Sequence, residues 1–197
     1  MNEQATQKIL ASSKGGKRAR TKAKLMDAAA VVIAEKGFDR ASLADIAIRA
    51  GMTRGAIYGN FRNKEELFLA LVAESWQPIV PKVDPSMSLK QQMRILGQTV
   101  AEEARARRRL ATAATAFQLY VLTHEEMQSH LRMQNAKIYR KLAASLRKMI
   151  PEKNLPMPAE CFVRVLDALI TGLLFTYFQT PELITEDVFV AAFEALA

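Results

Sequence analysis

The sequence predicts an all-α protein that combines an N-terminal three-helix domain containing a helix-turn-helix with a larger C-terminal helical domain. Apolar residues recur at helical spacing along most of the 197 residues. No alternation of apolar and polar residues is long enough to indicate a sheet. Pro78, Pro81 and Pro85 interrupt the helical pattern and mark a loop. The expected parts are a flexible basic arm over 1–17, the helix-turn-helix domain over 18–66, a connecting helix and proline-rich loop over 67–85, and the second helical domain over 86–197.

Positive charge is concentrated in the N-terminal third of the chain. Residues 1–66 hold 13 Lys/Arg and 7 Asp/Glu, a net charge of +6, whereas residues 67–197 hold 15 and 13, a net charge of +2. This distribution is expected if the first domain binds phosphates.

Other features indicate a cytoplasmic protein that is not embedded in a membrane. The longest uncharged apolar run, 168–178, has 11 residues, whereas about 18 are needed to span a bilayer. The basic N-terminus is not followed by the apolar block of a secretory signal. The single cysteine, Cys161, cannot form an internal disulfide and fits a reducing compartment.

The first helix is expected from Arg18 to Lys36. Its apolar positions follow the i, i+3, i+4, i+7, i+8 pattern of one helix face, and they are Leu25, Ala28, Ala29, Val32 and Ile33. Gly37 follows directly and is expected to end the helix as a C-terminal cap.

The segment 42–61, SLADIAIRAGMTRGAIYGNF, predicts two short helices joined by a turn at Gly51. Ser42 with Asp45 resembles a capping box and begins the first of these helices. The residues expected to be buried are Leu43, Ile46, Ala47 and Ala50 in the first helix, with Ile57 and Phe61 in and after the second.

The second of these helices has the features of a DNA-reading helix. Thr53 is placed to cap it, because its hydroxyl can accept a hydrogen bond from a free amide of the first turn. Arg54 follows in that first turn, where the positive end of the helix dipole disfavours a cation. Its position is explained if a phosphate or a guanine edge binds there, as in the major-groove helix of a helix-turn-helix.

The rest of the chain also predicts helices. The fourth is expected to begin near Asn63, where Glu66 completes a second capping pair, and to reach Trp76. Five more are expected over about 88–107, 110–122, 123–149, 159–179 and from 185 onwards. Thr123 with Glu126 resembles a capping box at the start of the long helix, and Thr185 is expected to cap the last one.

The segment 159–179 is apolar on more than one face. A helix that is apolar all round has to be buried on two sides. We expect one side to pack on the chain's own core and the other on a second subunit, to which the last helix adds a phenylalanine edge. The residues expected at this homodimer interface are Leu169, Leu173, Tyr177, Phe189 and Phe193. The alternative, a central helix in a monomeric bundle, stays open.

The segment from Arg20 to Glu74 resembles the DNA-binding region of TetR-family transcriptional repressors. The resemblance rests on EKGFDRASL at the end of the first helix, then ADIAIRAGMTRGAIYGNF, then RNKEELFLAL. It covers about 55 residues, and the remainder shows only the family's architecture of a larger helical domain for ligand binding and dimerisation. The resemblance therefore implies double-stranded DNA and a second copy of the chain as partners, without identifying a ligand.

The resemblance implies DNA contacts at positions in the first domain and its basic arm. These positions are Arg18, Arg20, Ser42, Thr53, Arg54, Gly55, Ala56, Tyr58, Asn60 and Lys64. Arg54 is expected to read a base or clamp a phosphate, because its guanidinium offers a bidentate fork to guanine. Lys64, in the first turn of the fourth helix, is expected to meet the DNA backbone. The arm around Arg18 and Arg20 is expected to enter a minor groove.

The other contacts implied by the resemblance are consistent with side-chain size and hydrogen bonding. Ser42 and Thr53 are expected to bind phosphates through hydroxyl and backbone amide, and Tyr58 through its phenol. Gly55 and Ala56 are small where the backbone approaches base edges.

The sequence departs from the family pattern at two positions next to the final phenylalanine. The family commonly has a histidine where this chain has Asn60, and a bulkier residue where it has Gly59. Asn60 can bond a phosphate or an adenine edge. Gly59 is expected to weaken a short helix by up to about 1 kcal/mol relative to alanine, so the base preference is expected to differ.

The C-terminal domain is expected to hold a small apolar or amphipathic effector. Six of nine methionines lie there, and methionine adapts to irregular apolar shapes, while ligand pockets commonly lie between the helices of bundles. The candidate lining residues are Met93, Leu96, Val100, Phe117, Tyr120, Val121, His124, Met127, Leu131, Phe162 and Leu166. For each residue alone, ordinary core packing is the alternative.

No motif indicates an enzyme, a cofactor or a metal. His124 and His130 are six residues apart, which is not the i, i+4 spacing of a helical zinc pair, and no nucleophile stands in a catalytic pattern. The sequence predicts a ligand-responsive transcriptional repressor that binds a palindromic operator as a homodimer. The alternative is a DNA-binding activator or DNA-organising protein whose C-terminal domain binds a protein partner.

Overall fold

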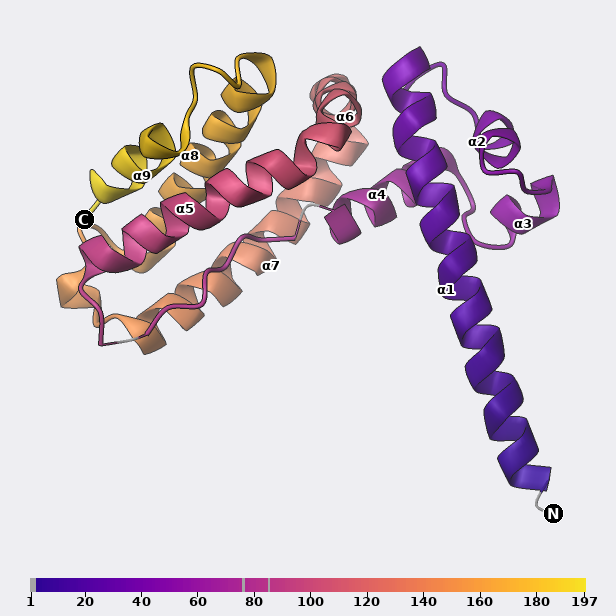
Figure 1. The fold of residues 1–197 in the computed structure, drawn as a ribbon, viewed down its shortest axis with the longest axis horizontal. Helices are drawn as coiled ribbons and strands as arrows, with labels where there is room; N and C mark the ends of the chain where they lie inside the picture. Colours follow the sequence, from indigo (N-terminus) through magenta and orange to yellow (C-terminus); the bar gives the residue numbers. More distant parts are fainter. Residues whose placement is uncertain (1–2, 76, 85) are drawn as a thin grey trace. The chain divides into compact units, whose positions relative to one another are not determined.

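The computed structural model describes residues 3–75, 77–84 and 86–197, and within these ranges the regular structure consists of helices alone (Figure 1). This confirms the all-α class. The chain forms two compact units: the first runs as far as Gln77 and also includes Thr112–Tyr120, and the second comprises Pro78–Ala111 and Val121–Ala197. Trp76 and Pro85 lie outside the described residues.

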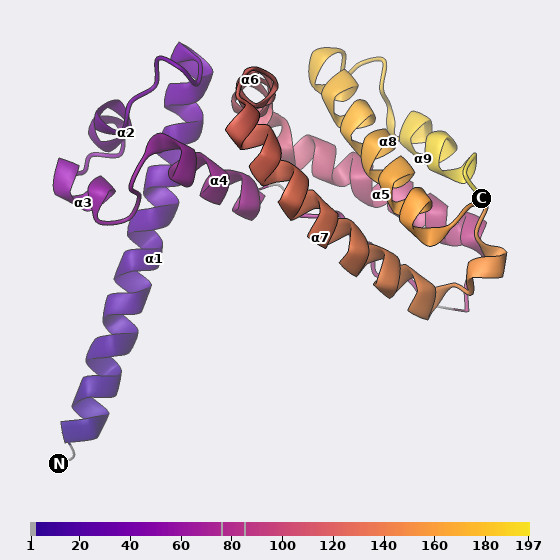
Figure 2. The ribbon, with the colours of Figure 1, turned by 180° about the vertical axis from the view of Figure 1, so that it is seen from behind.

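The first unit contains α1 (Glu3–Lys36), α2 (Leu43–Arg49), α3 (Arg54–Tyr58) and α4 (Lys64–Ser75). Gly37 and Gly51 have φ values of 78° and 65° and end α1 and the α2 segment in the left-handed conformation that glycine adopts without strain. The start of α1 differs from the expected boundary. The helix begins at Glu3 and continues through the stretch for which we expected a flexible arm (Figure 2), because residues 3–14 contain good helix formers and no proline.

The three predicted caps of this unit are confirmed. The Ser42 hydroxyl accepts a hydrogen bond from the Asp45 amide at 3.1 Å, and the Thr53 hydroxyl accepts one from the Ala56 amide at 3.2 Å. The Asn63 side chain accepts one from the Glu66 amide at 2.8 Å. Each short helix therefore begins where its capping residue places it.

An aromatic cluster ties part of α6 (Ala111–Thr123) into the first unit. The Phe68 and Phe117 rings stack with centroids 4.2 Å apart, and Tyr120 lies 4.2 Å from Phe38. Phe38 also meets Phe68 edge-on at 5.4 Å. The Tyr120 hydroxyl donates a hydrogen bond to Glu65 at 3.4 Å. The first unit thus extends beyond the expected boundary at residue 66, because the apolar face of α4 is covered by a segment distant in the sequence.

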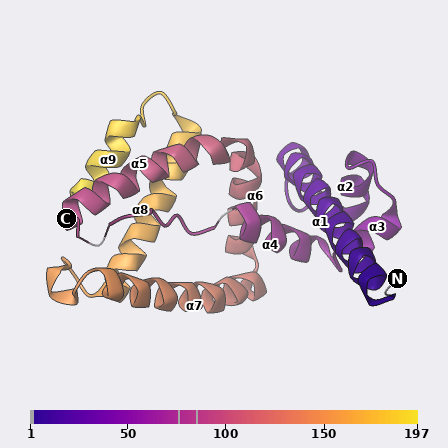
Figure 3. The ribbon, with the colours of Figure 1, turned by 60° about the horizontal axis from the view of Figure 1, so that its bottom comes forward.

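The second unit contains α5 (Leu89–Arg107), α7 (Glu125–Met149), α8 (Ala159–Gln179), α9 (Glu186–Glu194) and the short 3-10 turns Arg108–Leu110 and Glu152–Asn154. The helix α8 packs against both α7 and α5, and α9 lies along α5 (Figure 3). Ser88 and Gln91 form a complete capping box at the start of α5.

The expected capping box at Thr123 is wrong. The helix α6 continues through Thr123, whose hydroxyl lies 3.0 Å from Nδ1 of His124, and His124 is the N-cap residue of α7 without a side-chain cap bond. A Ser/Thr followed by Glu can occur in the last turn of one helix as readily as before the next, so the sequence pattern alone placed the boundary one residue early.

The close contact of α5 with α9 sets the core of the second unit. A Cβ on Gly97 would lie 2.8 Å from Cα of Val190, so only glycine allows this approach. Phe189 and Phe193 are 1% and 0% exposed within one chain. The expectation that they form a dimer interface is therefore wrong, because both rings fill the unit's own core together with Met93, Leu96, Val100 and Phe162.

Candidate nucleic-acid interface

The helix α3 is held in place by burial rather than by its own stability. It has five residues, far fewer than the ~12–15 needed for a marginally stable isolated helix. Ile57 is 0% exposed and Phe61 is 2% exposed, and α3 packs against α2. The opposite face of α3 therefore points to solvent.

That outward face carries four of the predicted DNA contacts. Arg54, Gly55 and Tyr58 are exposed, Tyr58 to 57%, and Ala56 is half-buried. The first turn of α3 holds no acidic residue, and among the described side chains Arg54 has no hydrogen-bond or ion-pair partner. A cation at the positive end of a helix dipole without a partner is electrostatically unfavourable until an anion arrives.

Other cations of the first unit are neutralised within the protein. Lys36 pairs with Asp45 at 2.9 Å, Arg62 with Glu66 at 3.2 Å, and Arg49 with Glu35. The side-chain hydrogen bond from Lys36 is the main reason that the pKa of Asp45 is lowered, and the bond from the Arg62 backbone amide has the same effect on the pKa of Glu66.

Lys64 has internal partners that the sequence did not reveal. Its ammonium donates to the backbone carbonyls of Phe38 at 3.0 Å and Asp39 at 2.9 Å, and it stands 4.9 Å from the centroid of the Phe38 ring. The carbonyl oxygens carry partial negative charge. They therefore offset the unfavourable interaction between the Lys64 cation and the positive dipole end at the start of α4. Lys64 thus holds the turn between α1 and α2 against α4, while the DNA contact implied by resemblance stays a prediction.

The residues after α3 also differ from the expected picture. The Asn60 side-chain amide donates to the Ala56 carbonyl at 2.7 Å and so closes the end of α3. Gly59 has a φ of −74° and is the C-cap residue, outside the helix proper. The expected cost of a glycine in the helix interior therefore does not apply to it in full.

The predicted contacts at Arg18 and Arg20 lie on the exposed surface of α1. Lys22, one turn along, stands 5.9 Å from the centroid of the Phe61 ring and so links α1 to the end of the α3 segment. At the other end of the motif, the Ser42 hydroxyl also donates to the Asp45 carboxylate at 2.8 Å.

The predicted effector-lining residues are divided between the two units. Phe117 and Tyr120 belong to the aromatic cluster of the first unit, where they pack on other rings, and their role in a pocket stays a prediction. The other predicted residues lie in the second unit and differ in burial. Those that are buried are Met93, Leu96, Val100, Phe162 and Met127. Those that are half-buried are Val121, Leu131 and Leu166, whereas His124 is exposed.

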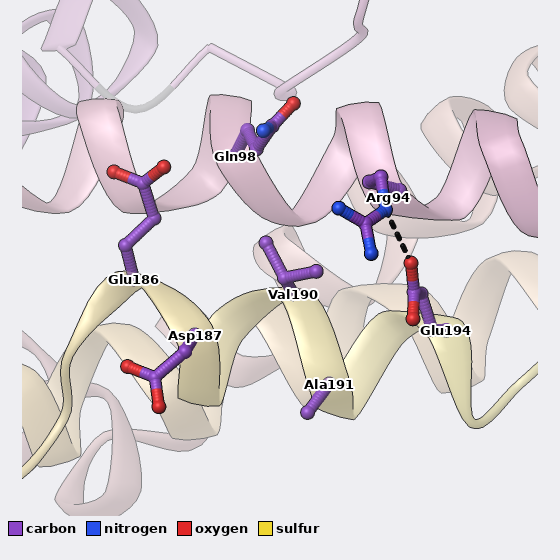
Figure 4. Close-up of a pocket in the computed structure, with 7 residues that line it drawn as sticks. All are labelled: Arg94, Gln98, Glu186, Asp187, Val190, Ala191 and Glu194. Atoms are coloured by element: carbon purple, nitrogen blue, oxygen red, sulfur yellow. Dashed lines mark hydrogen bonds and ion pairs between the residues drawn. The ribbon is translucent and has the colours of Figure 1, made fainter.

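A surface groove between α5 and α9 is a different site from the predicted pocket. It has a volume of about 430 Å³ and is lined by Arg94, Gln98, Glu186, Asp187, Val190, Ala191 and Glu194 (Figure 4). Arg94 and Glu194 form an ion pair across it at 2.6 Å. This open, charged groove is a poor receptor for an apolar effector.

The helix α8 is only partly covered by its own chain. Ala168 and Gly172 are exposed, and Leu169, Leu173 and Tyr177 are half-buried against the core of the second unit. By length and composition alone, α8 is apolar enough to cross a bilayer, with a mean hydropathy of 1.6 over a window that is 17% buried. Arg164 and Asp167 lie inside this helix, and charges at such positions are costly in lipid.

A cluster suited to a metal ion is absent from the described residues, where no three His, Cys, Asp or Glu side chains converge. His130 bonds Gln134 at 2.8 Å through its Nε2 atom.

Comparison with known proteins agrees with this geometry. Residues 25–71 match the family model described as bacterial regulatory proteins, tetR family. The chain is 26% identical over 159 residues to the transcriptional regulator SrpR of Pseudomonas putida, covering 79% of this chain and 74% of that protein. It is 50% identical to the regulator TtgR of Pseudomonas putida over 52 residues, 26% of this chain and 25% of that protein.

Similarity to solved structures concerns the whole fold. NalD, the secondary repressor of the MexAB-OprM multidrug efflux pump in Pseudomonas aeruginosa, superimposes with a TM-score of 0.62 at 23% identity, over 91% of this chain and 96% of that chain. At this level of identity the likeness establishes the architecture of two helical units.

We predict that Lys64→Met lowers the free energy of unfolding of the first unit by about 1–3 kcal/mol, because two carbonyls are left without their charged donor. Urea denaturation followed by circular dichroism measures the change, with Lys24→Met, an exposed lysine of α1, as the matched control. Equal stability of the two variants would contradict the structural role of Lys64.

Proposed function

This chain belongs to the TetR family of transcriptional regulators, and on that premise we propose that it is a ligand-responsive repressor that binds a palindromic operator as a homodimer. The observation that carries the proposal is the outward face of α3, where Arg54 is exposed and without an internal partner among the described side chains. Its guanidinium would bind a guanine edge or a phosphate, and Tyr58 would bind an adjacent phosphate.

Two copies of α3 are needed to read a palindrome, in successive major grooves about 34–36 Å apart. The uncovered side of α8 supports α8 as the element that joins the two chains. Ala168 and Gly172 are small and exposed, and a Cβ added at Gly172 meets nothing within 4 Å in its own chain. A partner helix could therefore approach closely and cover the half-buried Leu169, Leu173 and Tyr177.

The second unit offers apolar surface to an effector along one face of α7. Met127, Leu131, Ile138 and Leu142 share this face by helical spacing. Met127 is 9% exposed, but Ile138 is 37% exposed and Leu131 is half-buried, so the cover is incomplete along the middle of the helix. A small apolar or amphipathic molecule that completes this cover would favour one arrangement of the dimer through its differential affinity for the two states. NalD is a repressor, which supports repression as the sign of regulation.

Replacement of the unpaired arginine tests the DNA interface. We expect Arg54→Ala to weaken specific binding to the protein's own upstream DNA by about 1–3 kcal/mol, because alanine cannot supply the bidentate hydrogen bonds to a base. Fluorescence anisotropy at two salt concentrations measures the affinity. Arg49→Ala removes a charge that is already paired with Glu35 and should change the affinity much less, so equal effects of the two substitutions would refute base reading by Arg54.

A charge on the exposed stripe of α8 tests the dimer. Ala168→Arg is expected to convert the dimer into a folded monomer, because the side chain is exposed in one chain and an arginine would be buried without a partner in the interface. Sedimentation velocity measures the mass, and circular dichroism verifies the fold. Ala144→Arg, an exposed position on α7, should leave the dimer intact, and a dimeric Ala168→Arg protein would exclude this face.

The effector hypothesis predicts mutual exclusion between an apolar probe and operator DNA. Anilinonaphthalene sulfonate should fluoresce with the free protein and lose affinity when the operator is bound, by the same factor by which it weakens operator binding. Titrations in both orders, with footprinting of the upstream DNA, measure the two factors. Probe binding that leaves the operator affinity unchanged would favour the alternative of a protein partner for the second unit.

A further inference from the structure

The helix α1 continues well beyond the part that packs on the first unit. Leu25 is its first buried residue among the described side chains, and residues 18–24 are exposed apart from the half-buried Thr21. The 22 residues from Glu3 to Lys24 span about 33 Å at 1.5 Å per residue. In Figures 1 and 2 this part of α1 projects past α2 and α3. We call residues 3–24 the N-terminal extension.

The N-terminal extension has the charge of a polyanion-binding element. Residues 4–26 contain seven Lys/Arg and no Asp/Glu. Arg18, Arg20 and Lys24 are exposed, and ion pairs to them are absent among the described side chains. By helical spacing the basic positions spread over more than half of the helix circumference, and the remaining stripe holds mostly small residues, Ala5, Ile9, Ser12, Gly16, Ala19 and Ala23. The extension therefore offers little apolar surface for packing on protein, while its charges repel one another unless counter-charges are bound.

The C-terminal end of the extension lies beside the proposed DNA-reading helix. The contact between Lys22 and the Phe61 ring, at 5.9 Å, places this turn of α1 next to the end of the α3 segment. Residues closer to the N-terminus leave the body of the unit from that point. An operator bound by α3 would thus bring phosphates to the base of the extension.

We infer that the N-terminal extension is a helix that binds the phosphate backbone of the duplex flanking each operator half-site. This inference rests on the proposed function and replaces the expected arm in the minor groove. An α-helix with side chains is about 10–12 Å wide, whereas the minor groove is about 6 Å wide, so a helical extension does not fit into it. Its length of about 33 Å is close to one turn of DNA. The contacts carry no base specificity, and they lengthen the footprint and raise its salt dependence.

The first test removes charge from the extension. Wild type and the variant Arg18→Gln/Arg20→Gln/Lys24→Gln are titrated with an operator duplex that ends at the half-sites and with one that is extended by about one helical turn on each side. On the extended duplex, the variant should bind more weakly and the slope of log K against log salt should fall in magnitude by about 3 per bound extension, near 0.9 for each phosphate that is no longer neutralised. On the short duplex, the affinities of wild type and the variant should differ far less. The charge-matched control, Lys90→Gln/Lys141→Gln/Lys148→Gln, changes exposed lysines of the second unit and should behave as wild type.

The second test separates a helix from an extended arm. Gly16→Pro interrupts the helix and should reduce the affinity for the extended duplex towards that for the short one, whereas Gly16→Ala, with free space around the added methyl group, should retain or raise it. Unchanged binding by Gly16→Pro, or a preference for A·T over G·C flanks, would overturn the helical contact in favour of a minor-groove arm. Equal wild-type affinity for both duplex lengths would show that the extension touches no DNA. Failure of wild type to bind the short duplex would instead refute the proposed function.

Discussion

The burial of Ile57 and Phe61 is the constraint on which the proposed DNA interface depends. A helix of five residues does not persist in water on its own, so α3 exists because these two side chains are 0% and 2% exposed within the first unit. The Thr53 cap at one end and the Asn60 bond at the other close the remaining backbone groups. Arg54 and Tyr58 need no packing of their own and are aimed by residues on the opposite face. The backbone positions from which they project are therefore fixed by the core beneath them.

The first unit distributes its cations between internal and external partners. Lys36, Arg49 and Arg62 pair with carboxylates, and Lys64 is held by two carbonyls. These cations lie at helix ends or between helices, where they stabilise turns. Arg54 on α3 and Arg18, Arg20 and Lys24 on α1 are exposed instead. The net charge of the region thus overstates how many of its cations are free of partners within the protein.

Local rules predicted much of the fold, and tertiary contacts explain the errors. The caps at Ser42, Thr53 and Asn63 depend on neighbours within three residues, so the sequence determined them. The internal bonds of Lys64 were not foreseen, because its carbonyl partners lie 25 and 26 residues away. For Phe189 and Phe193, helical periodicity identified an apolar face but could not say whether the same chain or a second chain covers it. Gly97 decided that question, because its missing side chain lets α9 lie close on α5.

Folding of the first unit and its binding to DNA are expected to respond differently to salt, because they depend on different interactions. The core of the first unit is apolar, and its ion pairs lie on partly exposed side chains, where such pairs contribute little to stability. Salt therefore removes little of the folding free energy. DNA binding depends on cations that meet phosphates, and the affinity falls steeply as counterions compete. A rise in ionic strength would release the protein from DNA while α3 remains folded and correctly aimed, so that binding is regained without refolding when the salt concentration falls.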